Sequence, residues 1–401
     1  MLHTDNTTTQ LSVSESNRAR VLRHLYHHGV SSRAQIANAL ALTPAAITKI
    51  TAKLIEAGII EETGDMEGRK RRRSIGLHLD TARFHVIGVK FARSLVEIGV
   101  FDLAGTALSI EDLPTVNAET IPQTIAAIHS TINSLLDDDS SIIAIGMAVP
   151  GPYLRQIGYT AVVSSMQGWR SVNFLDEFAA AFRVPVFVEQ DARAGALAQY
   201  LFSTDGDCEN IAYYLLGEGI GLGIIDHGQL INGALGTATE IGHTSIDVNG
   251  PACDCGNTGC LERYCSAVTM HHRVNDMALI PGSRSMTHRQ ACEALFELVR
   301  AGNPAATSLL EETSRYVGYG CVTICNMFNP ERIIIGDILS GAGRQLLDIV
   351  RDVTRERTIP EVFEATTISL STLPSDAAVV GAAAVAIAKF LDHPSMFFDI
   401  G

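Results

Sequence analysis

The feature that most limits how this chain can fold is a histidine followed by three closely spaced cysteines. The four residues are His243, Cys253, Cys255 and Cys260. One imidazole and three thiolates form a complete tetrahedral zinc set with no position left for water, which is typical of structural and not of catalytic zinc. Glycines between the last two cysteines allow the tight turns that gather thiolates around one ion. The sequence therefore predicts a zinc loop over residues 243–260.

Two other interpretations of these cysteines are less favourable. Disulfides are disfavoured because the polar N-terminus, Met1–Gln10, lacks the basic and apolar regions of a secretory signal, so the expected compartment is the cytoplasm. Core cysteines are disfavoured by the polar, glycine-rich surroundings. By contrast, Cys321 and Cys325 lie one helical turn apart in an apolar segment and are expected in the core. No segment approaches the roughly 18 uninterrupted apolar residues of a membrane helix, so no membrane is expected as a partner.

The charge of the chain is divided unevenly. The whole chain carries a formal charge of −14. Residues 1–80 hold 11 Lys and Arg against 8 Asp and Glu, a net charge of +3, whereas residues 81–401 hold 19 against 36, a net charge of −17. An acidic body is repelled by DNA and would turn a basic head toward it. The length of 401 residues also favours more than one domain.

The first 60 residues are patterned as three helices. The first is predicted over Asn17–His28 and ends at Gly29. Ser32 can cap a second, short helix. Thr43 can cap a third, whose first residue is Pro44, where the missing N–H is not needed.

The third helix has one apolar and one polar face. Ile47, Ile50 and Leu54 repeat at three- and four-residue spacing and are predicted to be buried. The opposite face carries small or hydrogen-bonding side chains, which suit a helix lying in the major groove of double-stranded DNA. The residues predicted to bind DNA from this helix and its cap are Thr43, Ala45, Thr48 and Lys49.

Two short strands are predicted over Ile59–Leu79, around five consecutive cations. A hairpin with such a tip is a wing, which holds phosphates or enters a minor groove. Its predicted DNA-binding residues are Arg69, Arg71, Arg72 and Arg73. This order of elements favours a winged helix-turn-helix over residues 16–80, behind a disordered tail of residues 1–15. The alternative is a small helical domain with a solvated basic loop.

From His85 onward the pattern changes to alternating strands and helices. Two α/β lobes with mixed sheets are predicted over residues 81–401, with a ligand in the cleft between them. The principal predicted strands and helices are Phe84–Phe91, Leu95–Phe101, Ile121–Leu136, Ile142–Ala148, Val184–Glu189, Ile211–Leu216, Ile224–Asp226, Ala305–Phe328, Arg332–Ile335 and Asp376–Phe390.

Carboxylates and an amide gather near the zinc loop and near one strand end. Glu240 and Glu262 flank the zinc loop, and Gln190 and Asp191 follow the predicted strand Val184–Glu189. A sugar hydroxyl both donates and accepts hydrogen bonds, so such groups in a cleft suit a polyhydroxylated ligand. Any one of them alone is more often a solvated surface residue, and only their placement together favours a binding site.

These segments resemble the ROK family, named for its repressors, open reading frames and kinases. The most specific is EIGHTSIDVNGPACDCGNTGCLE, Glu240–Glu262, which is similar to the family's zinc and sugar signature. AVPGP at 148–152, VEQDARAGALA at 188–198 and LGEGIGLGII at 216–225 are similar to further family motifs. The resemblance implies an α/β protein: a winged helix-turn-helix followed by a two-lobed, actin-like or ribonuclease H-like ATPase-type fold with a structural zinc loop.

The resemblance also implies a sugar site and its residues. Asp191 matches the general base of the family's kinases, and Gln190 stands where those kinases have asparagine. His243 would serve both the zinc and the sugar. The implied sugar-binding residues are Gly151, Gln190, Asp191, Glu240, His243 and Glu262.

Three departures from the kinase pattern fall on the ATP side. Residues Lys90–Ser94 match the kinases' Asp-x-Gly-Gly-Thr phosphate loop. Lys90 stands in place of the aspartate, and residues with side chains, Arg93 among them, stand in place of the glycines, although a phosphate needs bare backbone for close approach. The second glycine loop carries Glu218 and Leu222, and Asp337 replaces the second glycine of a late Gly-Gly pair. Kinase activity is therefore not expected.

The sequence predicts a sugar-responsive DNA-binding regulator of carbohydrate metabolism genes, in the first place a repressor. Its expected partners are a double-stranded DNA operator and a sugar or sugar-phosphate effector, and it is expected to be a homodimer or homotetramer. The alternatives are a sugar kinase with a DNA-binding head, and a constitutive DNA-binding protein with a vestigial sugar site.

Overall fold

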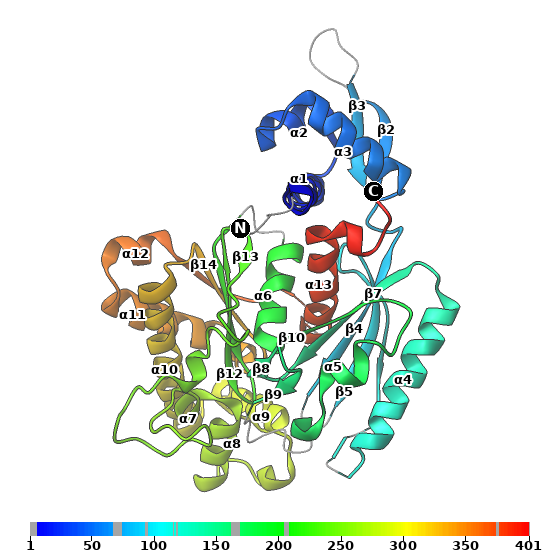
Figure 1. Ribbon diagram of the computed structural model, residues 1–401. Coiled ribbons are helices and arrows are strands. Elements are labelled where there is room, and N and C mark those ends of the chain that lie inside the picture. Colours follow the sequence, from blue (N-terminus) through cyan, green and yellow to red (C-terminus); the bar gives the residue numbers. More distant parts are fainter. Residues whose placement is uncertain are drawn as a thin grey trace, which may run out of the picture.

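A small helical head lies on a larger body of two lobes (Figure 1). The computed structural model describes residues 6–400, apart from 67–73, 93–94, 115, 118, 162–168, 204–207 and 374–376. None of the described helices combines the length and the hydropathy that crossing a bilayer requires.

The head is a winged helix built as the sequence predicted. Its sheet has the antiparallel order β1-β3-β2. Both predicted caps are present: the Ser32 hydroxyl accepts from the Gln35 N–H at 3.3 Å, and the Thr43 hydroxyl accepts from the Ala46 N–H at 3.2 Å. The elements are α1 (Asn6–His28), β1 (Ser31–Ser32), α2 (Arg33–Leu40), α3 (Pro44–Glu56), β2 (Ile60–Met66) and β3 (Ser74–Leu79).

Helix α1 begins at Asn6, eleven residues before the predicted start at Asn17. Residues 6–15 are therefore helical, where a disordered tail was predicted. The physical reason is cooperativity: once the buried part of a helix is nucleated, each added residue fixes one backbone unit and gains one hydrogen bond.

The first lobe is a five-stranded sheet of order β10-β7-β4-β5-β6. Strands β4, β5 and β6 form an antiparallel meander, and β7 and β10 run parallel to β4. Helices α4 and α5 pack on one face of the sheet, and α13 packs on the other (Figure 1). The elements are β4 (His85–Phe91), β5 (Val96–Asp102), β6 (Ala107–Asp112), α4 (Ile121–Asp138), β7 (Ile142–Val149), β8 (Tyr153–Leu154), β9 (Tyr159–Thr160), α5 (Phe174–Phe178), β10 (Val186–Gln190) and α13 (Ala377–Asp392).

The second lobe repeats this plan with the sheet order β13-β12-β11-β14-β15. Cys321 and Cys325 of α10 are 0% and 1% exposed, which confirms them as core residues. Helix α6 lies against α13 between the lobes (Figure 1). The elements are α6 (Asp191–Phe202), β11 (Ile211–Leu216), β12 (Ile220–Asp226), β13 (Gln229–Leu230), α7 (Glu262–Cys265), α8 (Ala267–Asp276), α9 (His288–Arg300), α10 (Pro304–Phe328), β14 (Arg332–Gly336), α11 (Arg344–Arg357), α12 (Pro360–Ala365) and β15 (Thr367–Leu370).

The head and the first lobe share one continuous apolar core. Leu22 and Leu25 of α1 belong to the same buried cluster as Phe390 of α13 and Ile400 near the C-terminus. The Tyr26 hydroxyl adds a polar contact, because it donates to the Leu103 carbonyl at 2.8 Å. The head is therefore packed against the body and is not joined to it by a flexible linker alone.

Candidate functional site

The junction between β10 and α6 places Gln190 and Asp191 at the inner end of the first-lobe sheet. Gln190 caps α6, since its amide oxygen accepts from the Arg193 N–H at 3.1 Å. Asp191 is the first residue of the helix, and its carboxylate accepts from the Ala192 N–H at 2.7 Å. Gly151 follows the neighbouring strand β7, and a Cβ atom there would lie 2.4 Å from Cγ of Gln190. These three predicted residues are therefore brought together, and the site requires glycine at 151.

Three carboxylates of the predicted sugar site also lie close enough to influence one another. The pKa of Glu240 is raised to about 7, mainly by burial, with the charges of Asp191 and Glu262 adding to the effect and Arg193 opposing it. Burial likewise raises the pKa of Asp191 to about 7, with Asp337 adding to the effect. The pKa of both groups thus lies near neutrality, far above that of a solvated carboxyl.

Glu262 is held by the backbone of the second lobe. Its carboxylate accepts from the Ile220 N–H at 3.0 Å, at the start of β12. A Cβ atom on Gly219 would lie 2.8 Å from that carboxylate oxygen, so the glycine turn before β12 makes room for it. Glu262 therefore joins the zinc-loop segment to the strand that faces α6.

The four predicted metal ligands form one cluster. The ligand atoms of His243, Cys253, Cys255 and Cys260 all lie within 4.8 Å of one another. The sulfurs of Cys255 and Cys260 are 3.6 Å apart, and the Cys253 sulfur is 3.8 Å from Nδ1 of His243. A tetrahedral ion with metal–sulfur bonds of about 2.3 Å would set its sulfurs about 3.8 Å apart. The cluster therefore has the atoms and spacing that could hold one metal ion.

The loop geometry couples this cluster to the carboxylates. Glu240 directly precedes the turn Ile241–His243, and Glu262 begins α7 two residues after Cys260. Gly259 has a φ of +69°, and a Cβ atom there would meet the Asp247 carbonyl at 1.7 Å, so only glycine fits this turn. Because Nδ1 of His243 faces a cysteine, its Nε2 is left for a second partner.

The side of the cleft that corresponds to the kinases' nucleotide side is lined by ion pairs. A cavity of about 240 Å³ there is lined in part by Lys90, Asp191, Arg289 and Asp337. Lys90 pairs with Glu97 at 2.9 Å, and Arg289 pairs with Asp337 at 3.0 Å.

Asp337 has φ +68° and ψ −157°, a backbone region that is essentially restricted to glycine. Its carboxylate also lies against the glycine turn, since a Cβ atom on Gly217 would be 2.2 Å from Oδ2. A carboxylate therefore stands where the kinase pattern has bare backbone.

Two other departures from the kinase pattern have different outcomes. Leu222 is 2% exposed and belongs to the second-lobe core, so its side chain does not face the cleft. Alternation along β12 explains this, because its neighbours Gly221 and Gly223 face α6 instead. Arg93 and Ser94 lie outside the described residues.

The predicted DNA-binding face of α3 has the expected exposure. Ile47, Ile50 and Leu54 are 0%, 8% and 0% exposed, which confirms the buried stripe. The opposite side chains, Thr43, Ala45, Thr48 and Lys49, are all exposed. The four predicted wing residues, Arg69, Arg71, Arg72 and Arg73, lie outside the described part of the chain.

Sequence reasoning missed one arginine at the cleft. Arg193 of α6 is 1% exposed and pairs with Glu189 at 2.9 Å, and its positive charge lowers the pKa of Glu240. A buried arginine must be paired, because an uncompensated charge in the interior is costly. The available signal was the single cation in the alanine-rich segment VEQDARAGALA.

Two protein families match this chain, one over the body and one over the head. The ROK family matches residues 86–389, and the MarR family matches residues 15–70. The DNA-binding transcriptional dual regulator NagC of Escherichia coli strain K12 is 33% identical over 346 residues, 84% of each chain. The xylose repressor of Bacillus spizizenii is 26% identical over 393 residues, 96% of this chain and 99% of that protein.

Solved structures of the same fold include a regulator and a kinase. A ROK family transcriptional regulator, a homologue of the E. coli MLC protein, has a TM-score of 0.80 at 27% identity and covers 96% of this chain and 98% of that one. A ROK family glucokinase from Streptomyces griseus in complex with glucose and AMPPNP has a TM-score of 0.65 at 26% identity, over 75% of this chain and 99% of that one. The protein therefore belongs to the ROK family, as a DNA-binding transcriptional regulator with a winged helix at its N-terminus.

Proposed function

We propose that the head, residues 16–80, binds a double-stranded operator and that a sugar bound in the cleft of residues 81–401 changes the affinity for that operator. The observation that carries this proposal is the contrast between the two sides of the cleft. Gln190 and Glu240 lie on one side with Asp191, whereas the other side, which Asp191 also borders, carries the ion pairs Lys90–Glu97 and Arg289–Asp337. A sugar fits the first arrangement, whereas the second offers phosphates a carboxylate, Asp337, where close approach needs bare backbone.

The sugar would be held by carboxylates and by one amide. Ionised carboxylates accept hydrogen bonds from sugar hydroxyls, and the Gln190 side chain can donate as well as accept. The proposed sugar-binding set is Gly151, Gln190, Asp191, Glu240, His243 and Glu262. Gln190 in place of the kinases' asparagine would change the length of one contact.

The metal in the loop is proposed to be zinc. Three thiolates and one imidazole are ligands that zinc prefers, and a closed set of four protein ligands makes the site structural. Bound there, zinc would cross-link the segment that presents Glu240 and Glu262 to the cleft. These protein groups, and not the ion, would contact the sugar, with His243 touching both.

The function is tested by measuring operator binding in the presence of sugars. Fluorescence anisotropy of labelled operator DNA is expected to change on addition of one sugar or sugar phosphate from a panel. If no ligand alters DNA binding, the protein is a constitutive DNA-binding protein and the proposal is wrong. Incubation with ATP and the same panel tests the kinase alternative: sugar-dependent turnover at an ordinary rate, on the order of 1–1000 per second, would support an enzyme.

Sugar affinity is expected to rise as the pH increases through about 7. Asp191 and Glu240 have pKa values raised to about 7, mainly by burial, so each is partly protonated at neutral pH. A sugar that donates hydrogen bonds to the ionised carboxylates favours proton release, and its binding therefore tightens until both groups are ionised. Titration calorimetry from pH 6 to 8 measures this.

The variant Asp191→Asn is the control for this pH dependence. It should bind sugar about 10- to 100-fold more weakly, because a hydrogen bond to a buried charged group contributes about 1.5–3 kcal/mol. Its remaining pH dependence should be shallower than that of the unaltered protein. An equal slope in both proteins would show that these carboxylates do not bind the sugar.

Replacing Lys49 by Ala is expected to reduce operator specificity. Lys49 is exposed on the face of α3 opposite its buried stripe, so we expect it to contact a base edge. The loss should be roughly 1–3 kcal/mol at the contacted base pair.

Replacing Arg72, in the basic run, should instead weaken binding to all DNA sequences similarly and flatten the salt dependence of binding by about one unit of slope. Anisotropy with operator and scrambled DNA across a salt series separates the two, and an unchanged affinity ratio for Lys49→Ala would contradict the placement of α3.

The protein is proposed to act in the cytoplasm as a homodimer or homotetramer. Operators are commonly two-fold symmetric, and paired winged helices match that symmetry.

A further inference from the structure

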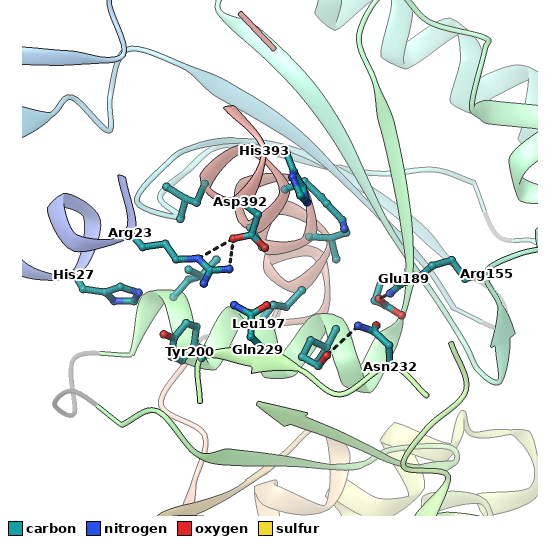
Figure 2. Close-up of a pocket in the computed structure, with 17 residues that line it drawn as sticks. Arg23, His27, Arg155, Glu189, Leu197, Tyr200, Gln229, Asn232, Asp392 and His393 are labelled. Carbon is teal, nitrogen blue, oxygen red and sulfur yellow. Dashed lines mark hydrogen bonds and ion pairs between the residues drawn. The ribbon is translucent and has the colours of Figure 1, made fainter. Parts of the chain in front are cut away.

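A second cavity lies at the joint between the head and the body. It has a volume of about 190 Å³ and is enclosed by α1 of the head and by α6, β13 and α13 of the body (Figure 2). Glu189 of β10 lines it, whereas the next residue, Gln190, contacts Gly151 in the cleft. Because successive strand residues point to opposite faces, the cavity and the proposed sugar site are separate.

The charge of this cavity is opposite to that of the body around it. Three permanent cations line it, Arg23, Arg155 and Lys389, against two carboxylates, Glu189 and Asp392. The lining is therefore positive by one charge with its histidines neutral, although residues 81–401 carry a net charge of −17. A cationic hollow in an acidic body is a place where anions concentrate.

Both carboxylates of the cavity are already neutralised by arginines. Arg23 donates from Nε to Asp392 at 2.8 Å, and Figure 2 shows this pair crossing from the head to the body. Glu189 accepts from Arg193 at 2.9 Å and also pairs with Arg155. A carboxylate with two arginine partners contributes little repulsion to an incoming anion.

Lys389 is the cation that remains available. It is half-buried on α13, and no hydrogen bond or ion pair joins its ammonium group to any residue that the structure describes. A lysine whose charge faces a cavity without a fixed acidic partner is a ready anion ligand. The guanidinium groups of Arg23 and Arg155 add planar donors suited to a phosphate or a carboxylate.

We propose that this cavity binds a small anionic metabolite that carries a phosphate monoester or a carboxylate group. Lys389 is its main ligand, and Arg155 and Arg23 assist. The volume lies below the roughly 300–1,000 Å³ of pockets that hold drug-sized ligands, so it suits a phosphate ion or a three-carbon phosphate better than a nucleotide.

The location gives the anion a means to act on the head. Arg23 and His27 belong to α1, whereas Lys389 and Asp392 belong to α13. A bound anion competes with Asp392 for Arg23 and at the same time bridges Arg23 to Lys389. Anion binding therefore changes the Arg23–Asp392 contact between the head and the body, and through it the DNA affinity of the head. The change in DNA affinity rests on the proposed function, but binding of the anion does not.

The test is titration calorimetry of the full chain with inorganic phosphate, glycerol 3-phosphate and acetate at constant ionic strength. At least one of these is expected to bind saturably at one site per chain. The variant Lys389→Gln should weaken that binding about tenfold or more, as expected for a lost charge-assisted hydrogen bond. Lys389→Arg should retain it, and Arg300→Gln, which removes an exposed cation of α9, should leave it unchanged.

Each outcome decides the proposal. Binding of the two phosphates but not of acetate identifies a phosphate site, and the reverse identifies a carboxylate site. Failure of all three probes to saturate overturns the proposal, as does equal binding by Lys389→Gln and the unaltered protein. Phosphate binding that is abolished by Asp191→Asn instead would place the anion in the sugar cleft and would also overturn it. Sugar titrations of Lys389→Gln, expected to be normal, keep this test separate from that of the proposed function.

Discussion

Replacing Cys260 by Ser is expected to release the bound metal ion and to lower the melting temperature by roughly 10 °C. Cys260 is 0% exposed and is the last of the four ligands in the loop, with its sulfur 3.6 Å from that of Cys255. Structural zinc contributes about 10–16 kcal/mol of apparent binding free energy in small zinc domains, and a serine hydroxyl does not replace a thiolate ligand. Even a loss of about 4 kcal/mol gives such a shift, at about 2–4 °C per kcal/mol for domains of this size.

Elemental analysis and differential scanning calorimetry check this prediction together. The unaltered protein should contain one zinc per chain, and Cys260→Ser should contain almost none. Cys208→Ser removes a thiol outside the cluster and should keep both the metal and the melting temperature. Sugar binding should fall with the metal, because Glu240 and Glu262 flank the loop. An unaltered protein without stoichiometric zinc would show that the four residues serve another purpose.

The parts of this structure that could be predicted from sequence are those fixed by nearby residues. A cap joins a side chain to a backbone N–H three residues later, so the starts of α2 and α3 followed from Ser32 and Thr43. The histidine and cysteine cluster is confined to one loop, and its four members could be named before the fold was known. Alternation also holds over short distances: the glycines on either side of Leu222 were a signal that its side chain faces the core.

Contacts between distant segments could not be predicted in this way. Arg289 and Asp337 form the ion pair that fills the nucleotide side, yet nothing in their local sequence links them. The same holds for Arg23 and Asp392, which lie 369 residues apart and join the head to the body. Such pairs depend on the relative placement of whole elements, and a single sequence without related sequences carries no record of it.

The C-terminal segment, residues 394–400, is the clearest example of such a contact. The sequence MFFDI at residues 396–400 did not predict any role, yet this segment packs into the joint between the head and the body. The Ile400 carbonyl accepts from Arg18 of α1 at 3.0 Å and from Lys53 of α3 at 3.3 Å. Glu15 of α1 accepts from the N–H and the hydroxyl of Ser395 at 3.1 and 2.7 Å.

Aromatic side chains complete this contact from the side of the body. The ring of Phe398 lies 5.0 Å from that of Phe84, between centroids, and Phe397 lies 5.6 Å from Phe390 of α13. Ile400 itself is 4% exposed and belongs to the core cluster that contains α1 and α3 residues. Residues 394–400 therefore help to hold the DNA-binding head on the body.

Deleting residues 394–401 is accordingly expected to loosen the head and to abolish tight operator binding, while sugar binding and zinc content remain. The deletion removes two partly buried phenylalanine rings, the buried Ile400 side chain and the carbonyl that accepts from Arg18 and Lys53, and so a large part of the joint. The head should then melt in a separate, earlier calorimetric transition, and amide exchange in α1 should accelerate. Met396→Ala, which alters a side chain that is 57% exposed, is the matched control and should change neither quantity. A truncated protein with one unchanged transition and normal exchange in α1 would mean that the shared core alone seats the head, and that the C-terminal contacts are incidental to it.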